Sequence, residues 1–149
     1  MPCQVTVLYA TASGNTEQLA VFTAESLRAL GADVRLQNIA DYPAEQLARA
    51  SIVLVLASTW GEGAPPPDAE AFCAALHEDS SSLAHIRYAV LALGSSAYAE
   101  FCACGRRMDE DFARRGAIRL SPRVDCDTKY KAEFTQWLEG IQSALKALA

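Results

Sequence analysis

The chain has 149 residues, 51% of them hydrophobic, and a formal net charge of −5. Its length suits one domain with a real core, and its acidity disfavours a nucleic-acid partner, because phosphate backbones need a basic protein face. Its apolar runs, such as residues 52–57, are too short to cross a bilayer.

The five cysteines are odd in number and contain no C-x-x-C pair. This pattern favours a reduced, cytoplasmic protein over a disulfide framework. Residues 1–4 run directly into a predicted strand, so we expect no signal peptide.

The first predicted strand, residues 4–9, leads into a hydroxyl-rich turn, Thr11-Ala12-Ser13-Gly14-Asn15-Thr16, and then into a predicted helix over residues 16–30. Backbone N–H groups and hydroxyls at a helix N-terminus favour the binding of a phosphate group. The turn has one glycine and no lysine, which excludes both the Walker motif and the dinucleotide fingerprint. An ordinary Ser/Thr turn with a helix cap is the alternative, and the turn alone does not decide between them.

Strands and helices alternate along the rest of the chain. Further strands are predicted at residues 33–37, 51–57, 87–93 and 117–124. The predicted helices are a short one begun by Asp41 and Pro43, one from Asp68 to Leu76, one ending at residues 114–116, and one over residues 130–148. This alternation predicts an α/β fold, a three-layer doubly wound sandwich with a five-stranded parallel sheet in the order 2-1-3-4-5. Ligands of such sheets bind beyond the carboxyl ends of the strands, at the point between strands one and three where the strand order changes direction.

Side-chain patterns predict which faces of the helices are buried. Leu19, Phe22, Leu27 and Leu30 predict one apolar stripe on the first helix, and Trp137 lies on a similar stripe of the last helix. The acidic run 109–111 is interpreted as solvated surface charge. His77 and His85 have no predicted acid or nucleophile beside them, so no catalytic residue is predicted.

Two more loops are expected at the same edge of the sheet. The loop 58–63 carries Trp60 among glycines, and the loop 93–98 ends in Tyr98. Glycines allow the backbone to approach a flat ring closely, and the two aromatic residues could stack on its two faces. For Trp60 the alternative is a chance exposed or loop-packing aromatic residue.

Four ordered motifs resemble those of short-chain flavodoxins and of the FMN domains of sulfite reductase flavoprotein and cytochrome P450 reductase. They are T-x-S-G-x-T at residues 11–16, STWGEGAPP at 58–66, LGSSAY at 93–98 followed by Phe101-Cys102, and RVDCD at 123–127 followed by Tyr130 and Trp137. The resemblance spans nearly the whole chain. The short connection between residues 124 and 130 leaves no room for the insertion of long-chain flavodoxins.

The resemblance implies one flavodoxin-like FMN-binding domain over residues 1–149, with no metal. It assigns Thr11, Ala12, Ser13, Gly14, Asn15 and Thr16 to the phosphate, and it assigns Ser58, Thr59, Trp60, Gly61, Glu62, Gly63, Leu93, Gly94, Ser95, Tyr98, Phe101, Cys102, Cys126 and Asp127 to the rest of FMN. Cys102 and Cys126 depart from the reductases, which often have Asn at the first position and, in cytochrome P450 reductase, an acidic residue at the second. Both are interpreted as packing thiols, with redox partners as the alternative.

The expected function is one-electron transfer from a reductase to an acceptor protein, with FMN supplying the chemistry. The acidic residues Glu62, Glu100, Asp125 and Asp127 near the binding edge favour docking on a basic-surfaced redox protein. We expect a stand-alone monomer, with neither nucleic acid nor a membrane as partner. The alternatives are an FMN-dependent two-electron reductase, for which no nicotinamide site is visible, and an accessory or interaction protein with this fold.

Overall fold

A computed structural model describes residues 4–10, 14–59, 64–97 and 102–148. Its strands are β1 (Gln4–Ala10), β2 (Asp33–Asn38), β3 (Ile52–Ser58), β4 (Arg87–Leu93), β5 (Ile118–Arg119) and β6 (Val124–Cys126). All pairings among them are parallel, in the order β2-β1-β3-β4-β5, and β6 also pairs with β4. The predicted α/β fold and strand order are confirmed.

The predicted fifth strand is present as two short strands, β5 and β6. On β4 two residues separate the paired positions Tyr88 and Leu91, whereas four residues separate their partners Arg119 and Val124. The extra residues include Pro122, which has no backbone N–H to donate to a ladder. The expectation of one continuous strand over 117–124 was therefore wrong.

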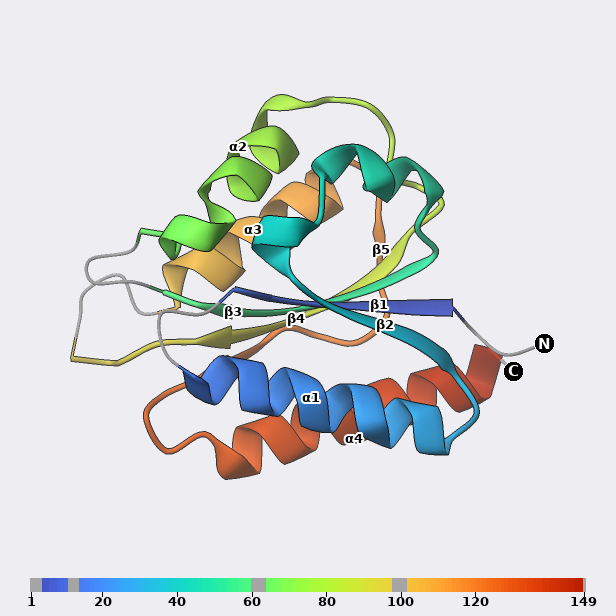
Figure 1. The fold of residues 1–149 in the computed structure, drawn as a ribbon, viewed down its shortest axis with the longest axis vertical. Coiled ribbons are helices and arrows are strands. Elements are labelled where there is room, and N and C mark those ends of the chain that lie inside the picture. Colours follow the sequence, from blue (N-terminus) through green and yellow to red (C-terminus); the bar gives the residue numbers. More distant parts are fainter. Residues whose placement is uncertain (1–3, 11–13, 60–63, 98–101, 149) are drawn as a thin grey trace.

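Helices cover both faces of the sheet (Figure 1). One face carries α1 (Gly14–Ala29) and α4 (Lys131–Leu148), and the other carries α2 (Glu70–Glu78) and α3 (Ala103–Arg114). Short 3-10 turns at Ile39–Asp41, Ala44–Arg49 and Pro67–Ala69 complete the second face. The second of these turns begins after Pro43, as predicted, but Asp41 does not cap it, because that turn has no side-chain cap. The first turn is capped by Asn38, whose Oδ1 accepts the Ala40 N–H at 2.9 Å.

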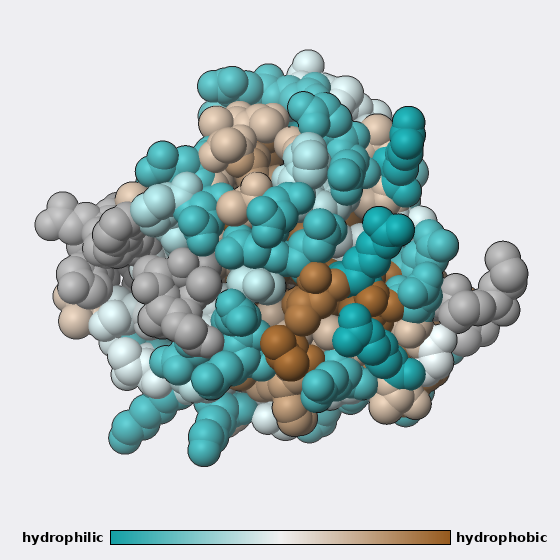
Figure 2. Space-filling view, viewed as in Figure 1, coloured by the Kyte–Doolittle hydropathy of each residue, from teal (hydrophilic) through white to brown (hydrophobic). Residues whose placement is uncertain are grey.

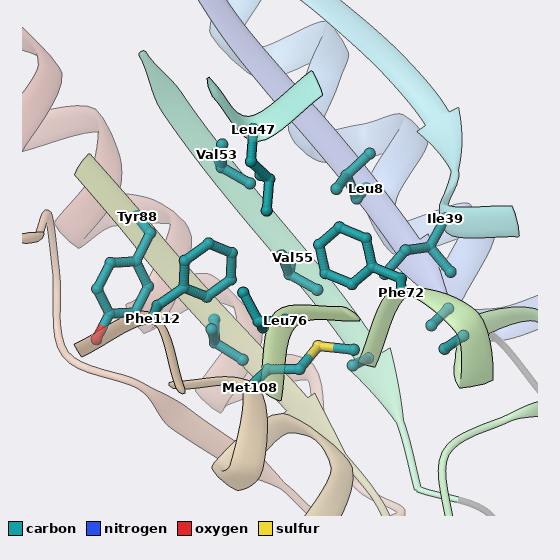
Figure 3. Close-up of a cluster of buried hydrophobic side chains, with 14 of the residues drawn as sticks. Leu8, Ile39, Leu47, Val53, Val55, Phe72, Leu76, Tyr88, Met108 and Phe112 are labelled. Atoms are coloured by element: carbon teal, nitrogen blue, oxygen red, sulfur yellow. The ribbon is translucent and has the colours of Figure 1, made fainter. Parts of the chain in front are cut away.

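Each face has its own hydrophobic core. Figure 3 shows the core under α2 and α3, where side chains of β1, β3 and β4 meet Phe72, Leu76, Met108 and Phe112. The Tyr88 and Phe112 rings stack there with centroids 4.9 Å apart. Trp137 is 1% exposed in the opposite core, as its position on the last helix predicts.

The buried stripe of α1 differs from the predicted one. Phe22 and Leu30 are 56% and 46% exposed, and only Leu27 of the predicted stripe is fully buried. The small residues Ala20 and Ala24 are fully buried with Leu27, so they form the face that packs on the sheet. Small side chains allow the helix to lie close to the sheet. On the face shown in Figure 2, hydrophilic side chains predominate, and the hydrophobic ones gather near the edge strand β2 beside α1.

Helix α3 also lies very close to the sheet. A Cβ on Gly105 would lie 2.4 Å from the Cβ of Ala92 on β4, closer than two non-bonded carbon atoms approach each other. The absence of a side chain at Gly105 therefore sets the distance between α3 and β4. This distance determines where the first turn of α3 meets the carboxyl ends of the strands.

Candidate functional site

A groove of about 270 Å³ lies at the carboxyl ends of the central strands. Its walls come from the start of α1, the ends of β3 and β4, and the connection from β6 to α4. The residues that line it are Asn15, Thr16, Ser58, Thr59, Leu93, Gly94, Asp127, Thr128 and Tyr130. Parallel strands end at one edge of a sheet, so segments more than 100 residues apart in sequence meet here.

The N-terminus of α1 forms one end of the groove. Its first backbone N–H groups have no partner within the helix, so they are available to an anion. Thr16 is 1% exposed, and its hydroxyl lies 2.6 Å from the hydroxyl of Ser58 at the end of β3. This contact fixes the helix start against the adjacent strand, while each hydroxyl keeps further hydrogen-bonding capacity.

Backbone hydrogen bonds join the ends of β3, β4 and β6. The Thr59 N–H donates to the Leu93 carbonyl at 2.9 Å, and the Gly94 N–H donates to the Cys126 carbonyl at 3.0 Å. A Cβ on Gly94 would lie 3.0 Å from the backbone nitrogen of Cys102. A side chain at residue 94 would therefore require the backbone at Cys102 to shift by a few tenths of an ångström.

Cys102 has an uncommon backbone conformation, with φ 56° and ψ 26° in the left-handed region. Its fully buried Sγ contacts the carbonyl oxygens of Ala92 and Cys126 at 3.4 and 3.5 Å. Burial raises the pKa of Cys102 to about 12, and it raises that of the equally buried Cys126 to about 12. Both thiols therefore stay protonated at neutral pH.

Asp127 forms a fixed negative charge on the groove wall. Its carboxylate accepts the N–H groups of Ser96 at 3.1 Å and Thr128 at 2.8 Å, and it also accepts the Ser96 hydroxyl. These hydrogen bonds, that of the Ser96 hydroxyl first, hold the pKa of Asp127 below its usual value. Asp127 thereby joins the segment after β4 to the start of the connection to α4.

Asp109 is a buried charge, so its interpretation as a solvated acid was wrong. It is 4% exposed and accepts two hydrogen bonds from the Arg119 guanidinium, each at 2.9 Å. Arg123 bridges Asp109 at 3.4 Å and Asp125 at 2.9 Å. The arginine beside Asp125 offsets its charge, so the binding edge is less negative than a count of its acids suggests.

The expectation that His77 has no acid beside it was also wrong. Its Nδ1 lies 3.1 Å from Asp111 Oδ1, on the side of the sheet away from α1 and α4. Within residues 4–10, 14–59, 64–97 and 102–148, no group of three or more His, Cys, Asp or Glu side chains could hold a metal ion. In the same ranges, no helix is long and apolar enough to span a membrane.

The groove brings together seven of the residues assigned to FMN: Asn15, Thr16, Ser58, Thr59, Leu93, Gly94 and Asp127. Gly14 begins α1, Ser95 follows Gly94 at the end of β4, and Cys102 and Cys126 do not line the groove. The predicted residues Thr11, Ala12, Ser13, Trp60, Gly61, Glu62, Gly63, Tyr98 and Phe101 lie outside the described residues, as does Glu100. Sequence reasoning did not assign Thr128 and Tyr130 to the site, although they follow Asp127 on a connection that the topology leads to this edge.

Comparison with known proteins agrees with this geometry. The model of the flavodoxin family matches residues 7–137. This chain belongs to the flavodoxin family. Flavodoxins bind FMN, so the groove lies where the family's cofactor is expected.

Related proteins fall into two groups. The sulfite reductase [NADPH] flavoprotein alpha-component of Bacillus subtilis (strain 168) is 38% identical over 143 residues, which are 95% of this chain and 24% of that protein. That of Neisseria meningitidis serogroup C is 38% identical over 97% of this chain and 24% of its own length. The chain thus spans about a quarter of the length of the curated relatives it matches.

Solved structures of flavodoxins match the chain over almost its whole length. The flavodoxin of Streptococcus pneumoniae TIGR4 superposes with a TM-score of 0.87 at 29% identity, covering 99% of this chain and 100% of that one. A short-chain flavodoxin associated with a PDU bacterial microcompartment gives 0.86 at 27% identity, covering 99% of both chains.

Proposed function

We propose that this chain is a one-electron carrier that uses FMN to pass electrons from a reductase to an acceptor protein. The observation that carries the proposal is the groove between the start of α1 and the ends of β3 and β4. It lies at the switch point of a sheet whose family binds FMN and functions in electron transfer.

The donor set fits the phosphate of FMN. Backbone N–H groups at the start of α1, which have no partner within the helix, suit a dianion without any cation, and the hydroxyls of Thr16 and Ser58 lie beside them. We propose that the turn Thr11-Ala12-Ser13 supplies the remaining contacts, as its resemblance to the family implies. The absence of lysine and arginine from residues 11–16 is consistent with a phosphate monoester held by neutral donors.

We further propose that Trp60 and Tyr98 stack on the two faces of the flavin ring. Support comes from the described residues beside them, because Thr59, next to Trp60 in sequence, lines the groove and is bonded to the end of β4. FMN supplies the one-electron chemistry when bound. The chain's own residues hold the phosphate, exclude water from the ring and keep the Asp127 charge at the groove wall.

The partners are proposed to be redox proteins with basic docking surfaces. The net charge of −5 and the acids near the binding edge support this, although Arg123 offsets Asp125. The free thiols Cys73, Cys102, Cys104 and Cys126 suit a reducing, cytoplasmic compartment. We propose that residues 1–149 act as one monomeric FMN-binding domain.

The test is a visible spectrum of the purified protein, followed by anaerobic photoreduction and a redox titration. We expect flavin absorption bands, release of FMN on denaturation, and two separate one-electron potentials. A single two-electron reduction would instead identify a two-electron reductase. A protein that takes up no added FMN would contradict the whole proposal.

The docking proposal has its own test. Reduction by a reductase with a basic surface should slow steeply as salt increases, because exposed charges are screened over roughly 10 Å at 0.1 M ionic strength. Rates that do not change with salt would contradict docking through acidic residues while leaving FMN binding intact.

A further inference from the structure

A second cavity, of about 500 Å³, lies between α2 and α3. Its walls include Cys73 and His77 on α2 and Cys104, Arg107 and Met108 on α3. It shares no lining residue with the groove described above. The proposed FMN function assigns no role to this cavity.

Two thiols meet in this cavity. Cys73 is half-buried and packs against the hydrophobic core that contains Cys104, which is 2% exposed. Both side chains line the same cavity from facing helices, and each affects the ionisation of the other. They are 31 positions apart in sequence (104 − 73), and the packing of α2 on α3 brings them together.

The two thiols differ in acidity. The hydrogen bond from Cys104 lowers the pKa of Cys73, with a smaller contribution from Arg107, although burial and the charge of Asp111 oppose this. The same hydrogen bond, with burial, raises the pKa of Cys104. Cys73 is therefore the more readily ionised and more accessible sulfur, and Cys104 is a buried thiol that lines the same cavity.

We propose that Cys73 and Cys104 form a redox-active dithiol, which hydrogen peroxide converts into a disulfide that joins α2 to α3. The Cys73 thiolate attacks one peroxide oxygen, the O–O bond breaks, and the departing hydroxide takes a proton to form water. The Cys104 sulfur then attacks the resulting Cys73 sulfenic acid, the S–O bond breaks, and a second water leaves with the Cys104 proton. Two thiols and one peroxide thus give one disulfide and two waters.

The other buried cysteines serve as internal controls. Cys102 and Cys126 are fully buried, and neither lines the cavity. Burial raises the pKa of each to about 12, so almost no thiolate is present at neutral pH. Under the same exposure to peroxide they should remain thiols.

The disulfide would form close to the groove, although neither Cys73 nor Cys104 lines it. The Cys104 backbone N–H donates to Thr59 Oγ1 at 3.0 Å, and Thr59 lines the groove. The proposal does not depend on FMN, since both thiols belong to a separate cavity. The test therefore measures formation of the disulfide, which we expect whether or not the protein contains FMN.

The experiment uses the full chain with Cys3→Ser, which removes the cysteine that lies outside the described residues. The reduced protein is exposed to hydrogen peroxide, then denatured, alkylated and digested with trypsin. Cys102 and Cys104 share the tryptic peptide 88–106, so tandem mass spectrometry must assign the linkage between them. We expect the loss of two of the four alkylated positions, a link between Cys73 and Cys104, and full recovery after reduction with dithiothreitol.

Single variants separate the two roles. Cys73→Ser should abolish the disulfide, and Cys104→Ser should leave a Cys73 sulfenic acid that dimedone traps. Four alkylated cysteines after exposure to peroxide would overturn the proposal. So would a disulfide that uses Cys102 or Cys126, or one that joins two copies of the chain on a non-reducing gel.

Discussion

The hydroxyl of Thr16 lies 2.6 Å from that of Ser58 and joins the first turn of α1 to the end of β3. These residues are 42 positions apart, and each belongs to a different loop motif at the binding edge. The contact therefore sets the position of the proposed phosphate site relative to the proposed ring site. Its strength can be measured directly.

A double-mutant cycle of Thr16→Val and Ser58→Ala should give a coupling free energy of about 1 kcal/mol, the usual net contribution of one hydrogen bond. The free energy of unfolding of the FMN-free protein is measured by urea denaturation. Ser51→Ala, at an exposed position just before the opposite end of β3, should show no coupling to Thr16→Val. Additive effects of the first two substitutions would mean that the contact contributes nothing.

Replacement of the two tryptophans should affect different properties, FMN affinity for Trp60 and the unfolding free energy for Trp137. Trp60→Ala should weaken FMN binding and leave the unfolding free energy unchanged, because a ring contact contributes about 1 kcal/mol beyond area burial. Trp137→Ala should lower the unfolding free energy by about 3–5 kcal/mol, because Trp137 is buried in the core between α4 and the sheet. Fluorescence titration with FMN and urea denaturation measure the two effects. Unchanged FMN affinity in Trp60→Ala would contradict stacking.

Two helical glycines should respond differently to alanine. Gly105→Ala should destabilise the fold by about 1–3 kcal/mol, since the new Cβ would meet Ala92 across a rigid helix–strand contact. At Gly140 on α4, an added Cβ would lie 2.7 Å from the Ser121 hydroxyl, which can rotate away, and in ordinary contact with the Ser121 Cβ. The Gly140→Ala variant should be neutral or more stable by up to about 1 kcal/mol, from helix propensity alone. Equal thermal stability of the two variants would refute the close approach of α3 to β4.

Asp127 should make stability depend on pH. Its pKa is lower in the folded state than in the unfolded state, so its contribution is fully present above the unfolded pKa of about 4 and is lost as the pH falls through the folded value. Asp127→Asn should therefore flatten the fall in thermal midpoint between about pH 5 and pH 2. Glu139→Gln, an exposed change of equal charge on α4, should leave that profile unchanged. A profile that Asp127→Asn does not alter would show that the hydrogen bonds of Asp127 give no net stabilisation.

Local sequence patterns predicted the elements of the fold and the edge at which the site lies. The apolar runs of β1, β3 and β4 are buried on both faces, so their hydrophobicity identifies them without knowledge of their neighbours. Alternation with helices then leaves few parallel topologies, and each of them brings Thr16, Ser58 and Gly94 to one edge. These features depend on short stretches of chain and on general topology.

Tertiary structure decided the features that depend on a distant partner. Asp109 is a buried ion-pair residue because Arg119 and Arg123 approach it from β5 and the segment before β6. Likewise, α1 buries Ala24 in place of Phe22 because close packing on the sheet favours the smaller side chain. Cys73 and Cys104 likewise line one cavity only because α2 and α3 pack together. Local periodicity determines which residues can share a face, whereas burial, charge pairing and the placing of two thiols in one cavity depend on which surfaces the folded chain brings together.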